Sequence, residues 1–189
     1  AAFLIVQYAG IRIQSFNGFL GINDLNVWFS KGFTIFLIVA LTNSFNLIDG
    51  IDGLAGGMAI LILTFLTVNF FYLGLESLVV VSVSLASATL AFLYFNWNPS
   101  RIFMGDTGSM ALGFVLSILL IIFLNASPSF LTSPRSIVGV AISLFIVPVY
   151  DTIRVMIKRV LKGNSPFQAD KNHVHHVLLR IGFSHGQAA

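Results

Sequence analysis

Residues 43–57, NSFNLIDGIDGLAGG, concentrate polar side chains in an otherwise strongly apolar sequence. Asn46, Asp49 and Asp52 follow one another at intervals of three residues. Because three residues is close to one helical turn, neighbouring members of this series share a face and could hold a hard cation or a polar ligand together. The glycines of the segment leave room for phosphate groups to approach the backbone. The alternative is that the DG and GG pairs only mark a turn between two membrane helices.

A second polar segment, residues 96–109 (NWNPSRIFMGDTGS), places Asp106 just before an apolar run. An acid in the first turn of a helix can act as a cap alone, worth about 0.3–1 kcal/mol. The neighbourhood favours a ligand site, because Asn96 and Arg101 are polar and glycines leave the acid accessible. Phe103 stands three residues before the acid, where its ring could stack on a flat base.

The third polar segment, residues 165–176 (SPFQADKNHVHH), gathers His173, His175 and His176 within four positions. A lone histidine is more often structural, but three together favour a ligand site. Imidazoles suit transition metals, and they can also donate to phosphate oxygens. The pattern differs from the HExxH of metalloproteases, and neither GxSxG nor a P-loop motif occurs in the chain.

The composition indicates a polytopic membrane protein. Of the 189 residues, 57% are hydrophobic and only 9% are charged, against about 25% charged residues in an average soluble domain. With no cysteine, disulfides and thiolate metal sites are excluded. The net charge of +3 could suggest nucleic acid, but the basic residues gather in the last quarter of the chain and are typical of a cytoplasmic membrane flank. These residues are Arg154, Lys158, Arg159, Lys162, Lys171 and Arg180.

We predict an all-α transmembrane helix bundle of about five full spans plus a truncated first one. Residues 1–9 are too short for the roughly 20 residues that a crossing needs, and residues 10–31 form a polar connection. The first full span is longer at its front if Trp28 and Phe29 lie at the interface as aromatic anchors. Pro148 is expected to kink the last span. The full spans cover about residues 33–48, 54–73, 78–95, 110–124 and 137–157. Residues 1–189 thus form a single membrane-embedded domain, and residues 158–189 form its basic, histidine-rich tail.

Counting the crossings places the three polar segments on one side of the membrane. Two spans separate the first segment from the second, and two more separate the second from the histidines. An even number of crossings returns the chain to the same compartment, and the basic tail identifies it as the cytoplasm. The face therefore offers carboxylates for a divalent cation and imidazoles for phosphate. This chemistry favours Mg²⁺-assisted phosphoryl transfer, with a lipid as one substrate.

All three segments resemble the signature sequences of the polyprenyl-phosphate N-acetylhexosamine-1-phosphate transferases (glycosyltransferase family 4). They occur in the order and with the spacing of that family. The SPFxADxNHxHH form is similar to members that move N-acetylglucosamine 1-phosphate from a UDP-sugar onto undecaprenyl phosphate, releasing UMP. The resemblance implies an inner-membrane enzyme with its site in the cytoplasm that starts a cell-envelope polysaccharide, using Mg²⁺ or Mn²⁺. A second copy of the chain is a candidate partner, and nucleic acid is not expected.

The resemblance also implies roles for individual residues. Asp106 and Asp49 would bind the metal, and both would be catalytic together with His175. The substrate-binding set would be Asn46, Asp52, Asn96, Arg101, Phe103, His173 and His176. Phe103 would stack on uracil, and the histidines would contact the pyrophosphate of the sugar nucleotide.

One departure concerns the adjacent aspartates that this family carries before the position where this chain begins. No Asp-Asp pair occurs in this sequence. We therefore expect the chain to be the C-terminal part of a longer transferase and to be inactive alone. The competing class is a transporter or metal-ion carrier, which would place charge within the spans. The identity of the amino sugar, the polymer and the lipid length are not fixed by the sequence.

Overall fold

The computed structural model describes residues 1–97, 99–126, 134–161 and 163, and it is built almost wholly from helices. This confirms the predicted all-α class, with one small hairpin added. In chain order the elements are α1 (Ala2–Tyr8), β1 (Ser15–Phe19), β2 (Ile22–Asp24), α2 (Val27–Ile48), α3 (Leu54–Tyr72), α4 (Glu76–Asn96), α5 (Gly105–Ala126), α6 (Pro134–Leu144) and α7 (Ile146–Leu161).

Four of these helices, α2 to α5, are long and apolar enough to cross a membrane, and the bent pair α6 and α7 raises the number to five if it is counted as one span. The first four predicted spans are thereby confirmed. The first begins at Val27 and so includes Trp28 and Phe29, as in the longer of the two predicted versions; the Asn26 side chain accepts a hydrogen bond from the Trp28 N–H at 2.9 Å and caps the helix. The protein is a multi-pass membrane protein.

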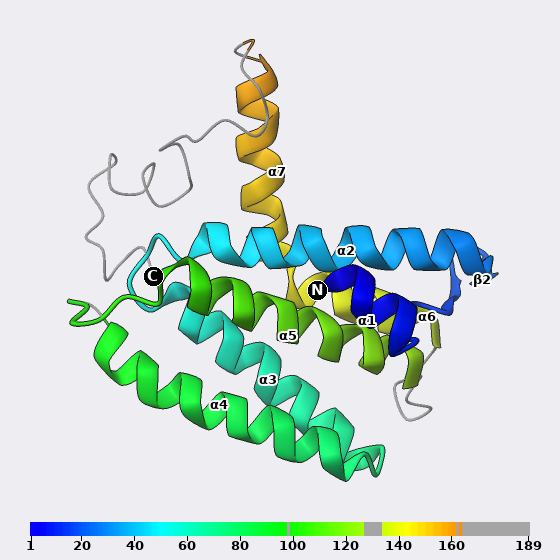
Figure 1. The fold of residues 1–189 in the computed structure, drawn as a ribbon, viewed down its shortest axis with the longest axis horizontal. Coiled ribbons are helices and arrows are strands. Elements are labelled where there is room, and N and C mark those ends of the chain that lie inside the picture. The colour runs from blue at the N-terminus through cyan, green and yellow to red at the C-terminus, as the bar shows by residue number, and fades with distance from the viewer. Residues whose placement is uncertain (98, 127–133, 162, 164–189) are drawn as a thin grey trace.

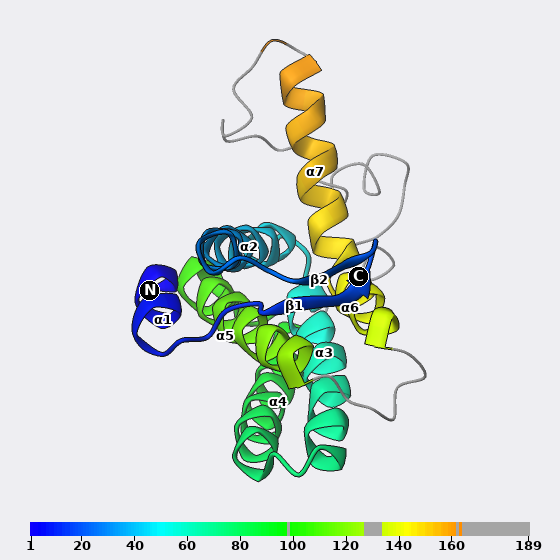
Figure 2. The ribbon, with the colours of Figure 1, turned by 90° about the vertical axis from the view of Figure 1, so that its right-hand side faces the viewer.

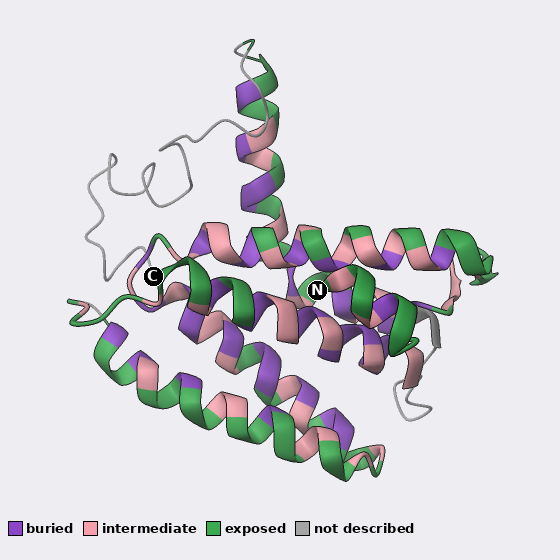
Figure 3. Ribbon diagram, viewed as in Figure 1, coloured by how far each residue is buried: buried purple, intermediate pink, exposed green. Residues whose placement is uncertain are grey.

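Helix α5 lies at the centre of the bundle, between α2 on one side and α3 on the other, and α4 packs on the outer side of α3 (Figures 1 and 2). The central helix α5 has the largest buried share and the outer helix α4 the smallest (Figure 3). In the apolar window of α5, 56% of the residues are buried, whereas in α4 the share is 11%. The exposed side chains of α4 are mostly apolar, as expected for a helix that faces lipid.

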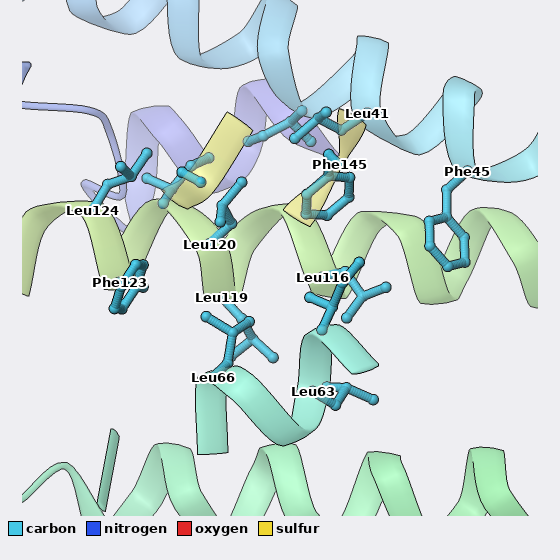
Figure 4. Close-up of a cluster of buried hydrophobic side chains, with 14 of the residues drawn as sticks. Leu41, Phe45, Leu63, Leu66, Leu116, Leu119, Leu120, Phe123, Leu124 and Phe145 are labelled. Carbon is cyan, nitrogen blue, oxygen red and sulfur yellow. The ribbon is translucent and has the colours of Figure 1, made fainter. Parts of the chain in front are cut away.

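The core lies where α2, α3, α5 and α6 meet, and Figure 4 shows its leucine and phenylalanine side chains interdigitating. Phe45 of α2 faces Phe145, with ring centroids 6.5 Å apart. Phe65 of α3 meets Phe123 of α5 edge to face at 5.6 Å. The first contact fixes α2 against the break between α6 and α7, and the second fixes α3 against α5.

The predicted polar connection at residues 10–31 folds in part into an antiparallel hairpin, which the sequence reasoning missed. The short strands contain glycine, asparagine and aspartate, which are rare in strands. The hairpin is held by tertiary contacts instead. Asn125 of α5 donates to the Arg12 carbonyl at 2.8 Å, and its Oδ1 atom accepts from the Gln14 N–H at 3.1 Å. The Ile13 N–H donates to Thr34 Oγ1 at 2.9 Å.

The expected fifth span is not one kinked helix. Helices α6 and α7 are separated at Phe145 and bent by 67°. Pro148 explains the break, because its ring excludes a helical carbonyl four residues earlier and it has no N–H to donate. That residue is Leu144, the last of α6. Asp151 and Arg154 lie within α7, joined by an ion pair at 3.2 Å.

Helices α2 and α5 are in close contact at Gly113, and this contact yields a test of the packing. A methyl group at Gly113 would lie 2.8 Å from Phe45 Cβ and 3.2 Å from Thr42 Cα. Gly113→Ala should therefore lower the unfolding free energy by about 1–3 kcal/mol through overpacking, measured as a lower apparent Tm of the detergent-solubilised natural protein.

Gly139→Ala in α6 is the matched control, since no atom lies within 4 Å of the added methyl group. This variant should leave the Tm unchanged or raise it slightly, because alanine favours a helix interior. An equal or higher Tm for Gly113→Ala than for Gly139→Ala would contradict the close approach of α2 and α5.

Candidate active site

The last turn of α2 meets the first turn of α5 through a cluster of polar side chains. The Nδ2 amide group of Asn46 donates hydrogen bonds to Ser109 Oγ at 2.7 Å and to Asp106 Oδ1 at 3.3 Å. Ser109 is fully buried, and its hydroxyl bonds back to the Gly105 carbonyl at 3.0 Å. The structure thus brings together two predicted residues that are 60 positions apart in the sequence.

Ser109 was not among the predicted site residues. Its sequence signal is its spacing, because it stands three residues after Asp106 and therefore on the same face of α5. The serine anchors the Asn46 amide, and this leaves the exposed carboxylate of Asp106 at the rim of the cluster.

Asp49, just beyond the end of α2, lies beside Asp106. Partial burial and the neighbouring Asp106 carboxylate raise the pKa of Asp49 from its usual 3.8 to about 6, against the opposing effect of a hydrogen bond from the Gly105 backbone. Burial and the nearby Asp106 carboxylate both disfavour the charge of Asp49, and a bound cation would relieve this cost. The predicted pairing of Asp49 with Asp106 therefore has a physical basis.

Asp52 and Asn96 belong to a second set of contacts, between the loop after α2 and the loop after α4. The Asn96 Oδ1 atom accepts from the Gly53 N–H at 3.0 Å, and its Nδ2 atom donates to the Ile102 carbonyl at 2.8 Å. Asp52 Oδ2 accepts from the Ser100 N–H at 3.2 Å. These two side chains join the loop that follows Asp49 to the loop that precedes α5 and Asp106.

Phe103 and Arg101 lie on the loop that leads to Asp106, and both are exposed. Phe103 is 79% exposed. The backbone of the loop is closed by a bond from the Arg101 N–H to the Phe95 carbonyl at 2.8 Å. The ring is thus presented on an ordered loop, available to stack on a planar group.

The predicted histidines His173, His175 and His176 lie outside the described residues, so their roles stay predictions. Within the described part of the chain, no group of three or more His, Cys, Asp or Glu side chains is placed to hold a metal ion. The pair Asp49 and Asp106 nevertheless fits Mg²⁺, which is commonly bound by one or two carboxylates together with substrate phosphates and waters. A Zn²⁺-type site would need more protein ligands.

Fold and site together define a multi-pass membrane protein with a carboxylate-based site at one end of its helix bundle. The family model "Glycosyl transferase family 4" matches residues 1–124, and the chain belongs to this family. The match includes the segments of Asp49 and Asp106 and ends within α5.

Three curated relatives illustrate the similarity. The chain is 39% identical over 158 residues to the probable undecaprenyl-phosphate N-acetylglucosaminyl 1-phosphate transferase of Bacillus subtilis, covering 84% of this chain and 43% of the relative. It is 34% identical over 171 residues to the decaprenyl-phosphate N-acetylglucosaminephosphotransferase of Mycolicibacterium smegmatis, covering 82% and 42%. It is 33% identical over 159 residues to the undecaprenyl-phosphate alpha-N-acetylglucosaminyl 1-phosphate transferase of Escherichia coli K12, covering 82% and 42%. The chain therefore spans about two fifths of the length of these relatives.

The raised pKa of Asp49 predicts a specific pH dependence of stability. A carboxyl group whose folded pKa lies above its unfolded value favours folding while it is protonated, so stability should fall as the pH rises from about 4 through 6. In the absence of divalent cations, Asp49→Asn should remove this part of the decline and have a higher Tm than wild type at pH 7.5.

Asp24→Asn is the control, because Asp24 is an exposed acid on the hairpin, distant in sequence from the site. Its Tm should follow the wild-type pH profile. A Tm of Asp49→Asn that stays at or below wild type between pH 5 and 7.5 would contradict the raised pKa of Asp49.

Proposed function

We propose that the natural full-length protein transfers N-acetylglucosamine 1-phosphate from a UDP-sugar to undecaprenyl phosphate. The observation that carries the proposal is the juxtaposition of Asn46, Asp49 and Asp106 at one end of a membrane bundle. The names of the relatives from B. subtilis and E. coli support the sugar and the lipid. The product would start a cell-envelope polysaccharide.

In the proposed reaction, an oxygen of the polyprenyl phosphate attacks the β-phosphorus of the UDP-sugar. The bond between that phosphorus and the bridging oxygen breaks, and UMP leaves with this oxygen. The products are the polyprenyl-pyrophosphoryl sugar and UMP. The barrier is electrostatic in large part, because negative charge is shared among the attacking, transferred and leaving oxygens.

Asp49 and Asp106 would hold Mg²⁺, or Mn²⁺ in its place. The cation, when bound, supplies charge neutralisation at the phosphates. The Asn46 amide orients the Asp106 carboxylate through its bond to Oδ1. Phe103 would stack on the uracil ring, and His173, His175 and His176 would contact the pyrophosphate. Arg101, exposed on the same loop, is a further candidate for phosphate.

We infer that the site faces the cytoplasm and that the protein lies in the inner membrane. Phe145, the residue before α7, packs against Phe45 in the last turn of α2, so α7 leaves the bundle near that turn. Helix α7 carries Lys158 and Arg159 in its own last turn. Basic residues next to a span favour the cytoplasmic side. The transporter alternative is less well supported, because Asp49, Asp52 and Asp106 lie at or just beyond helix ends and not in the middle of a span. The proposed homodimer rests on no contact described here.

The reaction is tested with the purified full-length protein, undecaprenyl phosphate, Mg²⁺ and UDP-N-acetylglucosamine labelled in the sugar. Labelled lipid and UMP should form in equal amounts. Asp106→Asn should lower kcat at least 100-fold with little change in Tm, because a cation ligand is lost from an exposed position. Labelled lipid from no UDP-amino sugar would contradict the proposed function, and near-normal turnover of Asp106→Asn would contradict the role of Asp106.

Stacking on Phe103 predicts a change in nucleotide affinity. Because stacking of a base on an aromatic ring contributes about 1–3 kcal/mol, Phe103→Leu should raise KM for the UDP-sugar about tenfold, while Phe103→Tyr should keep it within threefold. The measurement is the dependence of the initial rate on UDP-sugar concentration.

Phe36→Leu is the matched control, since Phe36 is a 66% exposed phenylalanine in the middle of α2, away from the site. Its KM should equal that of wild type. An unchanged KM in Phe103→Leu would show that the ring does not bind the nucleotide.

A further inference from the structure

Asn96 is a buried amide at the end of α4, with a side chain only 4% exposed. Its two polar atoms bond to the backbones of two different loops. The oxygen accepts from the Gly53 N–H at 3.0 Å, and the nitrogen donates to the Ile102 carbonyl at 2.8 Å. The side chain therefore bridges the loop after α2 to the loop before α5.

The bridged backbone has little freedom to adjust. Gly53 has a φ of +80°, a conformation that residues with a Cβ atom rarely adopt. An added Cβ atom there would also lie 3.2 Å from the Trp97 ring. Asp52 Oδ2 accepts from the Ser100 N–H at 3.2 Å and ties the same loops together a second time.

Both acids of the candidate site stand close in sequence to the bridged groups. Asp49 lies four residues before Gly53, and Asp106 lies four residues after Ile102. We propose that Asn96 is a positioning residue, which sets the separation of Asp49 and Asp106 by holding their loops in register. The amide is required because a single side chain must accept from one loop and donate to the other, which an ionised carboxylate or an alanine cannot do.

This role differs from the substrate contact predicted for Asn96 from the sequence, which stays a prediction. One hydrogen bond to each loop uses the amide oxygen and the amide nitrogen, and the side chain is shielded from solvent. The inference rests on the proposed function only in assigning a divalent cation to Asp49 and Asp106. It is therefore tested through cation binding, without any sugar nucleotide.

The experiment measures Mn²⁺ affinity of the full-length protein by electron paramagnetic resonance. Asn96→Ala should weaken Mn²⁺ binding at least tenfold. In the transfer assay at saturating cation, it should lower kcat while KM for the UDP-sugar stays within threefold. Asn69→Ala is the matched control, because Asn69 is similarly buried and its Nδ2 atom donates to a backbone carbonyl at 2.8 Å, but within α3 alone. Its Mn²⁺ affinity should equal that of wild type.

Wild-type Mn²⁺ affinity in Asn96→Ala would overturn the proposal. Mn²⁺ binding that is weakened equally in Asn69→Ala would also overturn it, because the effect would then reflect a general loss of stability. Gly53→Ala perturbs the same joint from the other loop and should also weaken Mn²⁺ binding at least tenfold, so it serves if Asn96→Ala does not fold. Wild-type affinity in Gly53→Ala would count against the proposal. Failure of the proposed function is distinguishable, because wild type would then bind Mn²⁺ without forming labelled lipid.

Discussion

The hydrogen bonds of Asn46 across the α2 and α5 interface are the constraint on which the candidate site depends. They join the last turn of one membrane helix to the first turn of another at 2.7 Å and 3.3 Å. The close approach at Gly113 makes these distances attainable, because a side chain there would hold the two helices apart. Packing in the apolar part of the bundle thus determines the geometry of its polar end.

This geometry places Asp49 beside Asp106 at a cost in stability. The raised pKa of Asp49 reflects burial first and repulsion from Asp106 second. Isolated carboxylates of this kind destabilise a fold unless a cation or a proton compensates them. The arrangement is typical of sites in which local stability is exchanged for function. It also explains why both acids lie at helix ends, where water and soluble ligands have access.

Much of this could be predicted from the sequence, because the relevant signals are local. Apolar runs of about 20 residues indicated α2 to α5. The three-residue spacings from Asn46 to Asp49 and from Asp106 to Ser109 follow helical periodicity. The even number of crossings predicted that the segments of Asp49 and Asp106 would lie on one side of the membrane, and the bond from Asn46 to Asp106 joins these two segments.

Other features depend on contacts between distant residues, and the sequence does not reveal them. The segment that leads into the hairpin is held by Asn125, which lies more than 100 residues further along the chain. The 67° bend requires Pro148 but also a bundle that leaves α7 free to turn outward. Asn96 resembles a ligand in the sequence, and only its bonds to Gly53 and Ile102 reveal a bridge.

The central claim is that Asp49 and Asp106 bind one cation between them. Its most direct test is the stoichiometry and affinity of Mn²⁺ binding to the full-length protein, compared among wild type, Asp49→Asn and Asp106→Asn. The account predicts one tightly bound ion in wild type and loss of most of that binding in either variant. An Asp49→Asn protein that still binds one Mn²⁺ with wild-type affinity would contradict it.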